Sequence, residues 1–356
     1  MLKKIKNMKK TTKSNLITYG IVIVAFVIMQ TLISTGSISS LLEGLMVPIC
    51  IYVILAVSLN LVVGILGELS LGHAGFMCVG AFSSAFFSKC MRDVITVDIV
   101  RFLLALLIGI AVAAIFGILI GIPVLRLKGD YLAIVTLAFG EIIKNLVNVL
   151  YIGKDSNGFH FSTKDVMALN MEPDGTVIVN GPQGITGTPQ DSTFLIGFIL
   201  ILITLFIVTN LINSRDGRAI MSIRDNRIAA ESVGINVTKY KLMAFTISAA
   251  LAGAAGVLYA HNLSTLTANT NNFGYNQSIM ILVFVVLGGI GSIRGSIIAA
   301  VILTLLPELL RGLSDYRMLI YAIVLIVMML FNWAPKAIEW RERHLRFGRK
   351  KKEAVQ

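Results

Sequence analysis

The residues best placed to do chemistry in this sequence are two side chains of opposite charge, Glu141 and Lys144, in the apolar stretch Leu132–Ile152. At a spacing of three residues, both side chains reach the same face of a helix. A charge at the centre of a membrane-spanning helix is costly unless it meets a partner or water. We therefore expect either a structural ion pair inside a helical bundle or a position on a transport or gating path, and both readings stay open.

Nothing in the sequence predicts catalytic or metal-binding chemistry. The four histidines are scattered without a cysteine or carboxylate at ligand spacing, and the three cysteines show no metal spacing. The pattern G-x-x-x-x-G-K-[ST], which holds ATP phosphates in a P-loop, does not occur. We expect no catalytic residue, no metal and no cofactor, so any ATP that drives this protein must bind to another subunit.

The helices that must position Glu141 and Lys144 are predicted to cross a membrane. Hydrophobic residues make up 56% of the 356 residues and charged residues only 14%, against about 25% charged residues in a soluble domain. Apolar runs long enough for a bilayer core recur along the chain, so we expect an all-α, polytopic transmembrane helical bundle of about ten spans. The expected spans are Leu16–Thr35, Leu45–Leu66, Leu71–Ser88, Phe102–Leu125, Leu132–Ile152, Thr193–Ile212, Leu242–Ala260, Ile279–Leu287, Ser296–Leu310 and Met318–Trp333.

The third, fifth and eighth spans carry glycines that can shape a pathway. Gly72 and Gly75 lie near the start of the third span, Gly140 lies in the fifth, and the short eighth span runs into Gly288 and Gly289. Short or glycine-broken segments often line a path at the membrane midplane. Close helix packing through small residues is the alternative explanation. We take these five glycines, with the charged pair, as candidates for the translocation path or its gate.

The distribution of positive charge predicts the orientation of the chain. When the spans alternate from a cytoplasmic N-terminus, most of the 31 Lys and Arg fall in the tails and in the loop 213–241, and loops rich in these residues stay inside. We expect a multi-pass protein of the cell membrane with both termini cytoplasmic: a basic tail 1–15, a membrane domain 16–333 with an outer loop 153–191, and a basic tail 334–356 that attracts membrane lipid. The charge lacks the interleaved aromatics of nucleic-acid binding.

The basic loop Asn213–Lys241 is predicted to contain one short helix, Ala219–Val233. Gly234 stands where a left-handed C-cap belongs, and Ile235 follows it. A helix held at the membrane surface by spans on both sides can dock on a partner protein. Composition alone fits a solvated loop equally well.

Several segments together resemble one family, the LivM-type permease subunit of branched-chain amino acid ABC importers. The resemblance implies a membrane fold of the LivH/LivM type that works by alternating access. The partners it implies are a second, LivH-like permease subunit, two ATP-binding subunits and an extracytoplasmic solute-binding protein. The segments are LSLGHAGFMCVGA at Leu69–Ala81, LRLKGDYLAIVTLAFGEII at Leu125–Ile143, Arg218–Ala260, SIMILVFVVLGGIGSIR at Ser278–Arg294, and LPELLR at Leu306–Arg311.

The basic loop also resembles the ABC-importer pattern of E-A-A, three residues, then glycine. Ala229, Ala230 and Gly234 match this pattern, whereas Ile228 replaces the glutamate. We expect the small alanines to fit a groove of the ATP-binding subunit and the surrounding arginines to pair with its acidic residues. The ATPase-coupling residues implied are Arg224, Arg227, Ala229, Ala230, Glu231 and Gly234.

The outer loop departs from the family. The segment NGPQGITGTP at Asn180–Pro189 resembles the family's glycine-rich motif, but extra residues, roughly Phe159–Val179, precede it. A turn signal at Glu172–Gly175 before the β-branched stretch Thr176–Val179 predicts a small hairpin there. The extra residues could form a docking surface for the binding protein or a mere insertion.

The expected function is the translocation of branched-chain or related hydrophobic amino acids by the permease subunit of an ATP-driven importer. Within the same class, a urea or short-amide importer is the alternative. From a different class, an ion-coupled secondary transporter could use Glu141 and Lys144. The basic loop and the scarcity of intramembrane carboxylates argue against that alternative, and no filter sequence predicts a channel.

Overall fold

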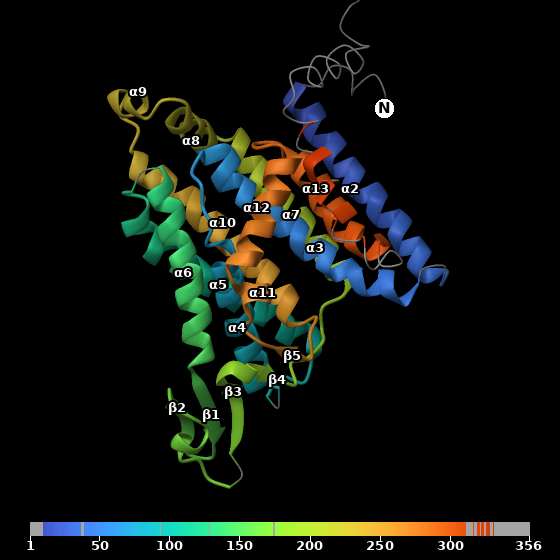
Figure 1. Ribbon diagram of the computed structural model, residues 1–356, viewed down its shortest axis with the longest axis vertical. Helices are drawn as coiled ribbons and strands as arrows, with labels where there is room; N and C mark the ends of the chain where they lie inside the picture. The colour runs from blue at the N-terminus through green and yellow to red at the C-terminus, as the bar shows by residue number, and fades with distance from the viewer. Residues whose placement is uncertain are drawn as a thin grey trace, which may run out of the picture.

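The computed structural model describes residues 10–36, 39–92, 94–127, 129–173 and 175–310, and beyond them residues 316, 319–320, 322–323, 325–327 and 330. Its helices form a bundle with short strands gathered at one end (Figure 1). The helices are α2 (Lys10–Ser34), α3 (Ser40–Asn60), η1 (Leu61–Leu66), α4 (His73–Cys90), α5 (Asp98–Val124), α6 (Asp130–Asn148), η2 (Met167–Leu169), η3 (Gly181–Gln183), α7 (Phe194–Asn213), α8 (Arg215–Asp225), α9 (Arg227–Ser232), α10 (Val237–Ala260), α11 (Thr270–Phe273), α12 (Tyr275–Gly288) and α13 (Ile293–Leu309).

Five described helices are long and apolar enough to cross a membrane: α2 from Leu16, α3 with η1, α5, α7 and α10. Four more predicted spans coincide with α4, α6, α12 and α13, which are shorter, less apolar or more charged. The eighth predicted span is indeed short, since the 14 residues of α12 extend about 21 Å against ~30 Å for the hydrocarbon core. The tenth, Met318–Trp333, lies largely outside the described residues, so the count of ten stays a prediction.

The core forms around the continuous helix of α3 and η1, whose most apolar stretch is 89% buried, against 6% for α2. Beside it, α10 packs closely on α4 and α5. A methyl group at Gly80 of α4 would lie only 2.5 Å from the Cα of Gly253 in α10. Membrane helices have little hydrophobic drive to associate, so such small-residue contacts hold them together.

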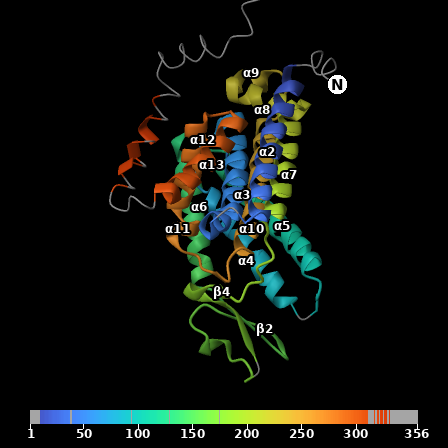
Figure 2. The same cartoon turned by 90° about the vertical axis from the view of Figure 1, so that its right-hand side faces the viewer.

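Helix α2 packs on the outside of the bundle, beside α7 (Figure 2). The contact is aromatic, because the ring of Phe26 stacks on Phe198 with centroids 3.8 Å apart and on Phe194 at 5.1 Å. The rest of α2 leaves many large apolar side chains exposed, as a helix that faces lipid requires.

A small antiparallel sheet follows α6. Strand β1 (Tyr151–Asp155) pairs with both β2 (Gly158–Ser162) and β3 (Thr176–Asn180), in the order β2-β1-β3. The predicted strand at Thr176–Val179 is thus confirmed, but the hairpin prediction is wrong, since the hairpin is β1–β2 and its turn is held by the Asp155 carboxylate accepting from the backbone N–H of Asn157. A second sheet pairs β4 (Ile185–Thr186) with β5 (Thr265–Leu266).

The strands and the pair α8–α9 lie at opposite ends of the bundle in both views (Figures 1 and 2). We call these the sheet end, formed by β1–β5 and the adjoining helix ends, and the α8–α9 end, formed by residues 214–241 and the helix ends that they contact. Each carries candidate functional residues.

Candidate functional site

The predicted single helix Ala219–Val233 is wrong, because the structure breaks it at Asn226. That residue is extended, with φ −155° and ψ 103°, and its side-chain oxygen accepts from the N–H of Ala229 at 3.1 Å. Asparagine is a favoured N-cap for this reason. Ser214 caps α8 in the same way, accepting from the N–H of Gly217. The loop therefore presents two short capped helices, α8 and α9.

The predicted left-handed cap at Gly234 is confirmed. Its φ is +84°, a conformation that glycine adopts without steric cost. The N–H of Gly234 donates to the carbonyl of Glu231, and that of Ile235 to the carbonyl of Ala230 at 3.1 Å. These are the hydrogen bonds of a helix that ends on a left-handed residue.

The outward face of α9 is not the one expected. Ala230, expected in a groove of the partner, is only 3% exposed and packs against Ile223 and Val237, so its side chain turns into the chain's own apolar cluster. Exposed instead are Ile228, at 79%, and Val233, at 75%. Around them lie Ala229, which is exposed, and the half-exposed ion pair of Arg227 and Glu231.

Arg224 reaches toward the membrane bundle, although its side chain stays 38% exposed. Its Nη1 donates to the carbonyl of Gly64 in η1 at 3.0 Å, while its Nε and Nη2 bind the Asp225 carboxylate at 3.1 and 2.9 Å. The residue was grouped by sequence with the partner contacts, but its guanidinium already has partners in this chain.

Glu141 and Lys144 form the ion pair that their spacing predicts. Lys144 Nζ also donates to the hydroxyl of Thr270 in α11 at 3.1 Å. Glu141 Oε1 accepts from the backbone N–H of Tyr275, the first residue of α12, at 2.8 Å. A carboxylate is favourable at a helix N-terminus, so the pair fastens α11 and the start of α12 to α6.

Four of the five candidate path glycines, Gly72, Gly75, Gly140 and Gly288, lie at contacts between helices. A methyl group at Gly75 would lie 2.7 Å from the Cα of Gly140, and one at Gly72 would overlap the backbone of α6. Gly288 faces the backbone of α13, and Gly289 ends α12 with φ +92°. The glycines thus let α4 approach α6 and let the chain turn sharply between α12 and α13.

A second ion pair, between Glu68 and Lys241, carries no sequence signal. Glu68 follows η1 and Lys241 lies in α10, so 173 residues separate them. Their side chains are 16% and 6% exposed. The sequence places Lys241 in the basic loop, whereas the structure joins it to Glu68 beside the end of η1.

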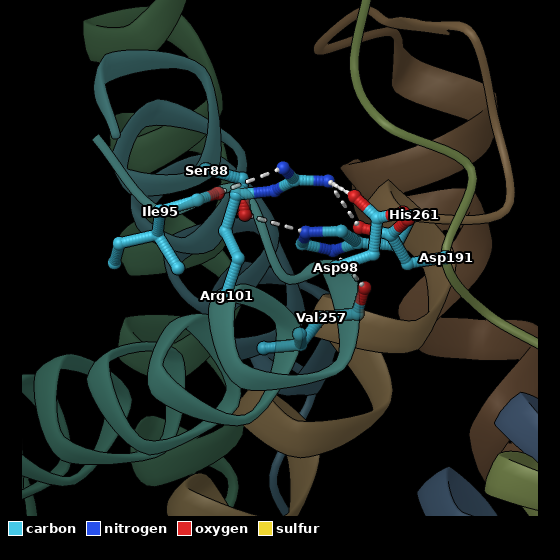
Figure 3. A network of polar contacts seen from close by, with 7 residues as sticks. All are labelled: Ser88, Ile95, Asp98, Arg101, Asp191, Val257 and His261. Carbon is cyan, nitrogen blue, oxygen red and sulfur yellow. Dashed lines mark hydrogen bonds and ion pairs between the residues drawn. The ribbon is translucent and has the colours of Figure 1, made fainter. Parts of the chain in front are cut away.

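The sheet end holds a buried polar network (Figure 3). Arg101 Nη2 binds the carboxylates of Asp98 at 2.6 Å and Asp191 at 3.2 Å, and Nη1 donates to a backbone carbonyl. Next to it, His261 Nδ1 lies 3.0 Å from the carbonyl of its own helix and Nε2 lies 2.8 Å from the hydroxyl of Ser88. Burial lowers the pKa of His261, so its imidazole is neutral at physiological pH.

The histidines and acidic residues of the described segments do not assemble into a metal site. No group of three or more His, Cys, Asp or Glu side chains lies together in this part of the chain. His73 is instead buried against the hydroxyl of Ser58 at 2.7 Å. The arrangement offers contact surfaces and buried polar contacts between helices.

Comparison with known proteins decides between the transporter classes. Residues 41–331 match the family described as "Branched-chain amino acid transport system / permease component". The chain belongs to this family. It is 34% identical over 337 residues to the high-affinity branched-chain amino acid transport system permease protein LivM of Salmonella typhimurium, covering 92% of this chain and 75% of the relative. It is 36% identical over 298 residues to the LivM protein of Escherichia coli, covering 81% and 67%.

A more distant relative is the probable branched-chain amino acid transport permease protein LivM of Methanocaldococcus jannaschii, which is 25% identical over 275 residues, covering 69% of this chain and 74% of the relative. No solved structure matches the chain. Membership of the family confirms the predicted class: this is a multi-pass membrane permease component of an ABC importer, a transport protein and not an enzyme. It decides against an ion-coupled secondary transporter.

Proposed function

We propose that the α8–α9 end faces the cytoplasm and binds an ATP-binding subunit through α9. The observation that carries this proposal is the exposure of Ile228 in α9, at 79%, and of Val233, the residue that ends α9, at 75%. The ion pair of Arg227 and Glu231 borders them. An apolar patch rimmed by polar groups is typical of a protein–protein interface. When ATP draws two such subunits together, α9 would move with the one it contacts.

The variants Ile228→Asp and Val233→Asp test the contact. We expect each to lose the ATP-binding subunit on co-purification of the complex, because a carboxylate would be buried without a partner. Thr238→Asp, also exposed at this end, is the matched control and should keep that subunit. Retention of the subunit by both α9 variants would overturn the proposal.

The orientation has its own test. Ser232 in α9 and Asn157 in the β1–β2 turn are both exposed, and the three native cysteines are buried. We expect a membrane-impermeant thiol reagent to label Asn157→Cys in intact cells and Ser232→Cys only after permeabilisation. The reverse pattern would place the α8–α9 end outside and exclude a cytoplasmic partner there.

The solute we propose is a branched-chain or related hydrophobic amino acid. The support is the 34–36% identity to LivM proteins over most of the chain. The path would run between this subunit and a second, related permease. In proteoliposomes that contain the whole complex and its binding protein, isoleucine and valine should compete with labelled leucine. Competition by urea without competition by valine would instead favour the urea or short-amide alternative.

We also propose that the sheet end receives the extracytoplasmic solute-binding protein. Phe161 of β2 is 66% exposed and Met167 is 88% exposed, both within the segment that departs from the family. Phe161→Asp and Met167→Asp should weaken capture of the binding protein by the immobilised complex. Equal capture by wild type and both variants would show that Phe161 and Met167 do not bind the solute-binding protein.

A further inference from the structure

The helix that forms the centre of the core ends in an unusual turn. Residues Leu61–Leu66 continue α3 as a π-helix, and Gly67 ends it with φ +80°. The last carbonyls of any helix lack partners within that helix, and π-helical turns are frequent at functional sites. The end of η1 therefore needs hydrogen-bond donors from elsewhere in the chain.

Arg224 of α8 supplies one of these donors. Its Nη1 donates to the carbonyl of Gly64 at 3.0 Å, and the carboxylate of Asp225 holds the other two nitrogens in place. The stem of Arg224 lies across Gly67, where a methyl group would come within 2.5 Å of its Cγ. The carboxylate of Asp225 thus orients the guanidinium toward η1, and the lack of a side chain at Gly67 leaves room for the stem of Arg224.

The opposite side of Gly64 touches the break between α12 and α13. A methyl group at Gly64 would lie 2.6 Å from the Cα of Gly291, which has φ +81°. The side chain of Asn60 spans the same contact: its oxygen accepts from the N–H of Gly291 at 2.9 Å, and its nitrogen donates to the hydroxyl of Ser296 at 2.9 Å. Gly64 therefore stands between α8 and the turn that joins α12 to α13.

We propose that Arg224 is a positioning residue that passes the movement of α8 to η1 and, through Gly64 and Asn60, to the break between α12 and α13. This inference rests on the proposed docking of an ATP-binding subunit at α9. Arg224 then acts within the permease, where it joins α8 to η1. Arginine suits this role because its planar fork binds a carboxylate through two nitrogens and a carbonyl through the third in one fixed geometry, which the single ammonium of lysine does not provide.

The test compares Arg224→Gln with Arg218→Gln in the reconstituted complex. Arg218 is exposed on the same helix, and within the part of the chain that the structure describes its guanidinium donates to the backbone carbonyl of Asn213. Arg218→Gln therefore removes the same charge from α8 without removing a contact to η1. We expect Arg224→Gln to keep the ATP-binding subunit and its ATP hydrolysis but to lower uptake per ATP about tenfold, within the usual range of coupling between sites. Arg218→Gln should stay near wild type, and Arg224→Lys should fall between.

Asn60→Ala tests the other end of the same chain of contacts. If the two residues act in one relay, the double variant Arg224→Gln/Asn60→Ala should lose no more uptake per ATP than the worse single variant, whereas independent structural effects would multiply. Multiplied losses, or unchanged uptake per ATP in Arg224→Gln, would overturn the inference. Loss of the ATP-binding subunit in Arg224→Gln alone would make Arg224 a docking contact, which overturns the inference but leaves the proposed function intact.

Discussion

The two ends of the bundle are held in different ways. At the sheet end, Arg101 and His261 tie α4, α5, α10 and the segment before α7 through buried polar groups. At the α8–α9 end, α9 packs on a small apolar cluster separate from the main core, and the polar ties to the bundle come from Lys241 and Arg224. Regions with few buried contacts open at lower free energy. The comparison indicates that the sheet end is a fixed frame, whereas α8 and α9 at the other end can shift relative to the bundle.

The largest effect is expected from Arg101→Met, which removes the centre of the sheet-end network. Asp191, with its side chain 15% exposed, would lose its cation, and an uncompensated buried charge costs about 3–5 kcal/mol. Thermal unfolding of the purified protein should show a strong loss of stability. The control Arg92→Met, at an exposed position of the same end, should have little effect. Equal stability of the two variants would mean that the network does not hold this end.

A smaller loss is expected from Lys241→Met at the α8–α9 end. Its Nζ binds the carboxylate of Glu68, so removing it leaves that carboxylate without its cation, at a cost of about 3 kcal/mol. The double variant Glu68→Gln/Lys241→Met should recover most of the loss, since neither charge remains. If Lys241→Met destabilises the protein more than Arg101→Met, the assignment of the fixed and shifting ends is reversed.

Local features could be predicted from sequence, and contacts across the fold could not. Gly234 and Ile235 revealed a helix end because the capping hydrogen bonds join neighbouring residues. Glu141 and Lys144 revealed an ion pair because three residues separate them. The break at Asn226 was also a local signal, since asparagine is a favoured N-cap, but the surrounding helical pattern obscured it.

Tertiary packing decided the features that were missed. Ala230 faces inward because Ile223 and Val237 converge on it. Glu68 meets Lys241 across 173 residues, and no periodicity records such a contact. The resemblance to the family identified the segment proposed to carry the coupling residues, yet it could not say which side chains turn toward the permease and which toward solvent.

The ion pair of Glu141 and Lys144 in α6 allows a further comparison, between a structural role and a role in transport. Glu141→Gln keeps a carbonyl that can accept from the N–H of Tyr275 but leaves Lys144 without its carboxylate, so we expect a loss of about 1–3 kcal/mol. In Glu141→Gln/Lys144→Met no charge remains, and assembly should largely recover. Stability is measured by thermal unfolding and transport by solute uptake. A double variant that assembles normally but stays inactive would place Glu141 on the transport path instead.

The smallest effect concerns pH at the sheet end. Burial, aided by the nearby Arg101 cation, lowers the pKa of His261 below its usual 6.5, although the carbonyl of Val257 and the charge of Asp191 act in the opposite sense. The unfolded chain therefore binds a proton more readily than the folded protein. Stability should be complete above pH ~6.5 and fall as the pH drops toward the lowered value, by at most about 1.4 kcal/mol per pH unit.

Thermal unfolding at a series of pH values from neutral downward measures this slope. His261→Gln should flatten it, because the group that titrates is gone, while the amide can still bond to Ser88 or to the backbone. His160→Gln, at the salt bridge with Asp155 in the sheet, should retain the decline, since His261 is still present in this variant. An unchanged slope in His261→Gln would show that the sheet end is held independently of this histidine, and Arg101 would then be the main tie of the fixed frame.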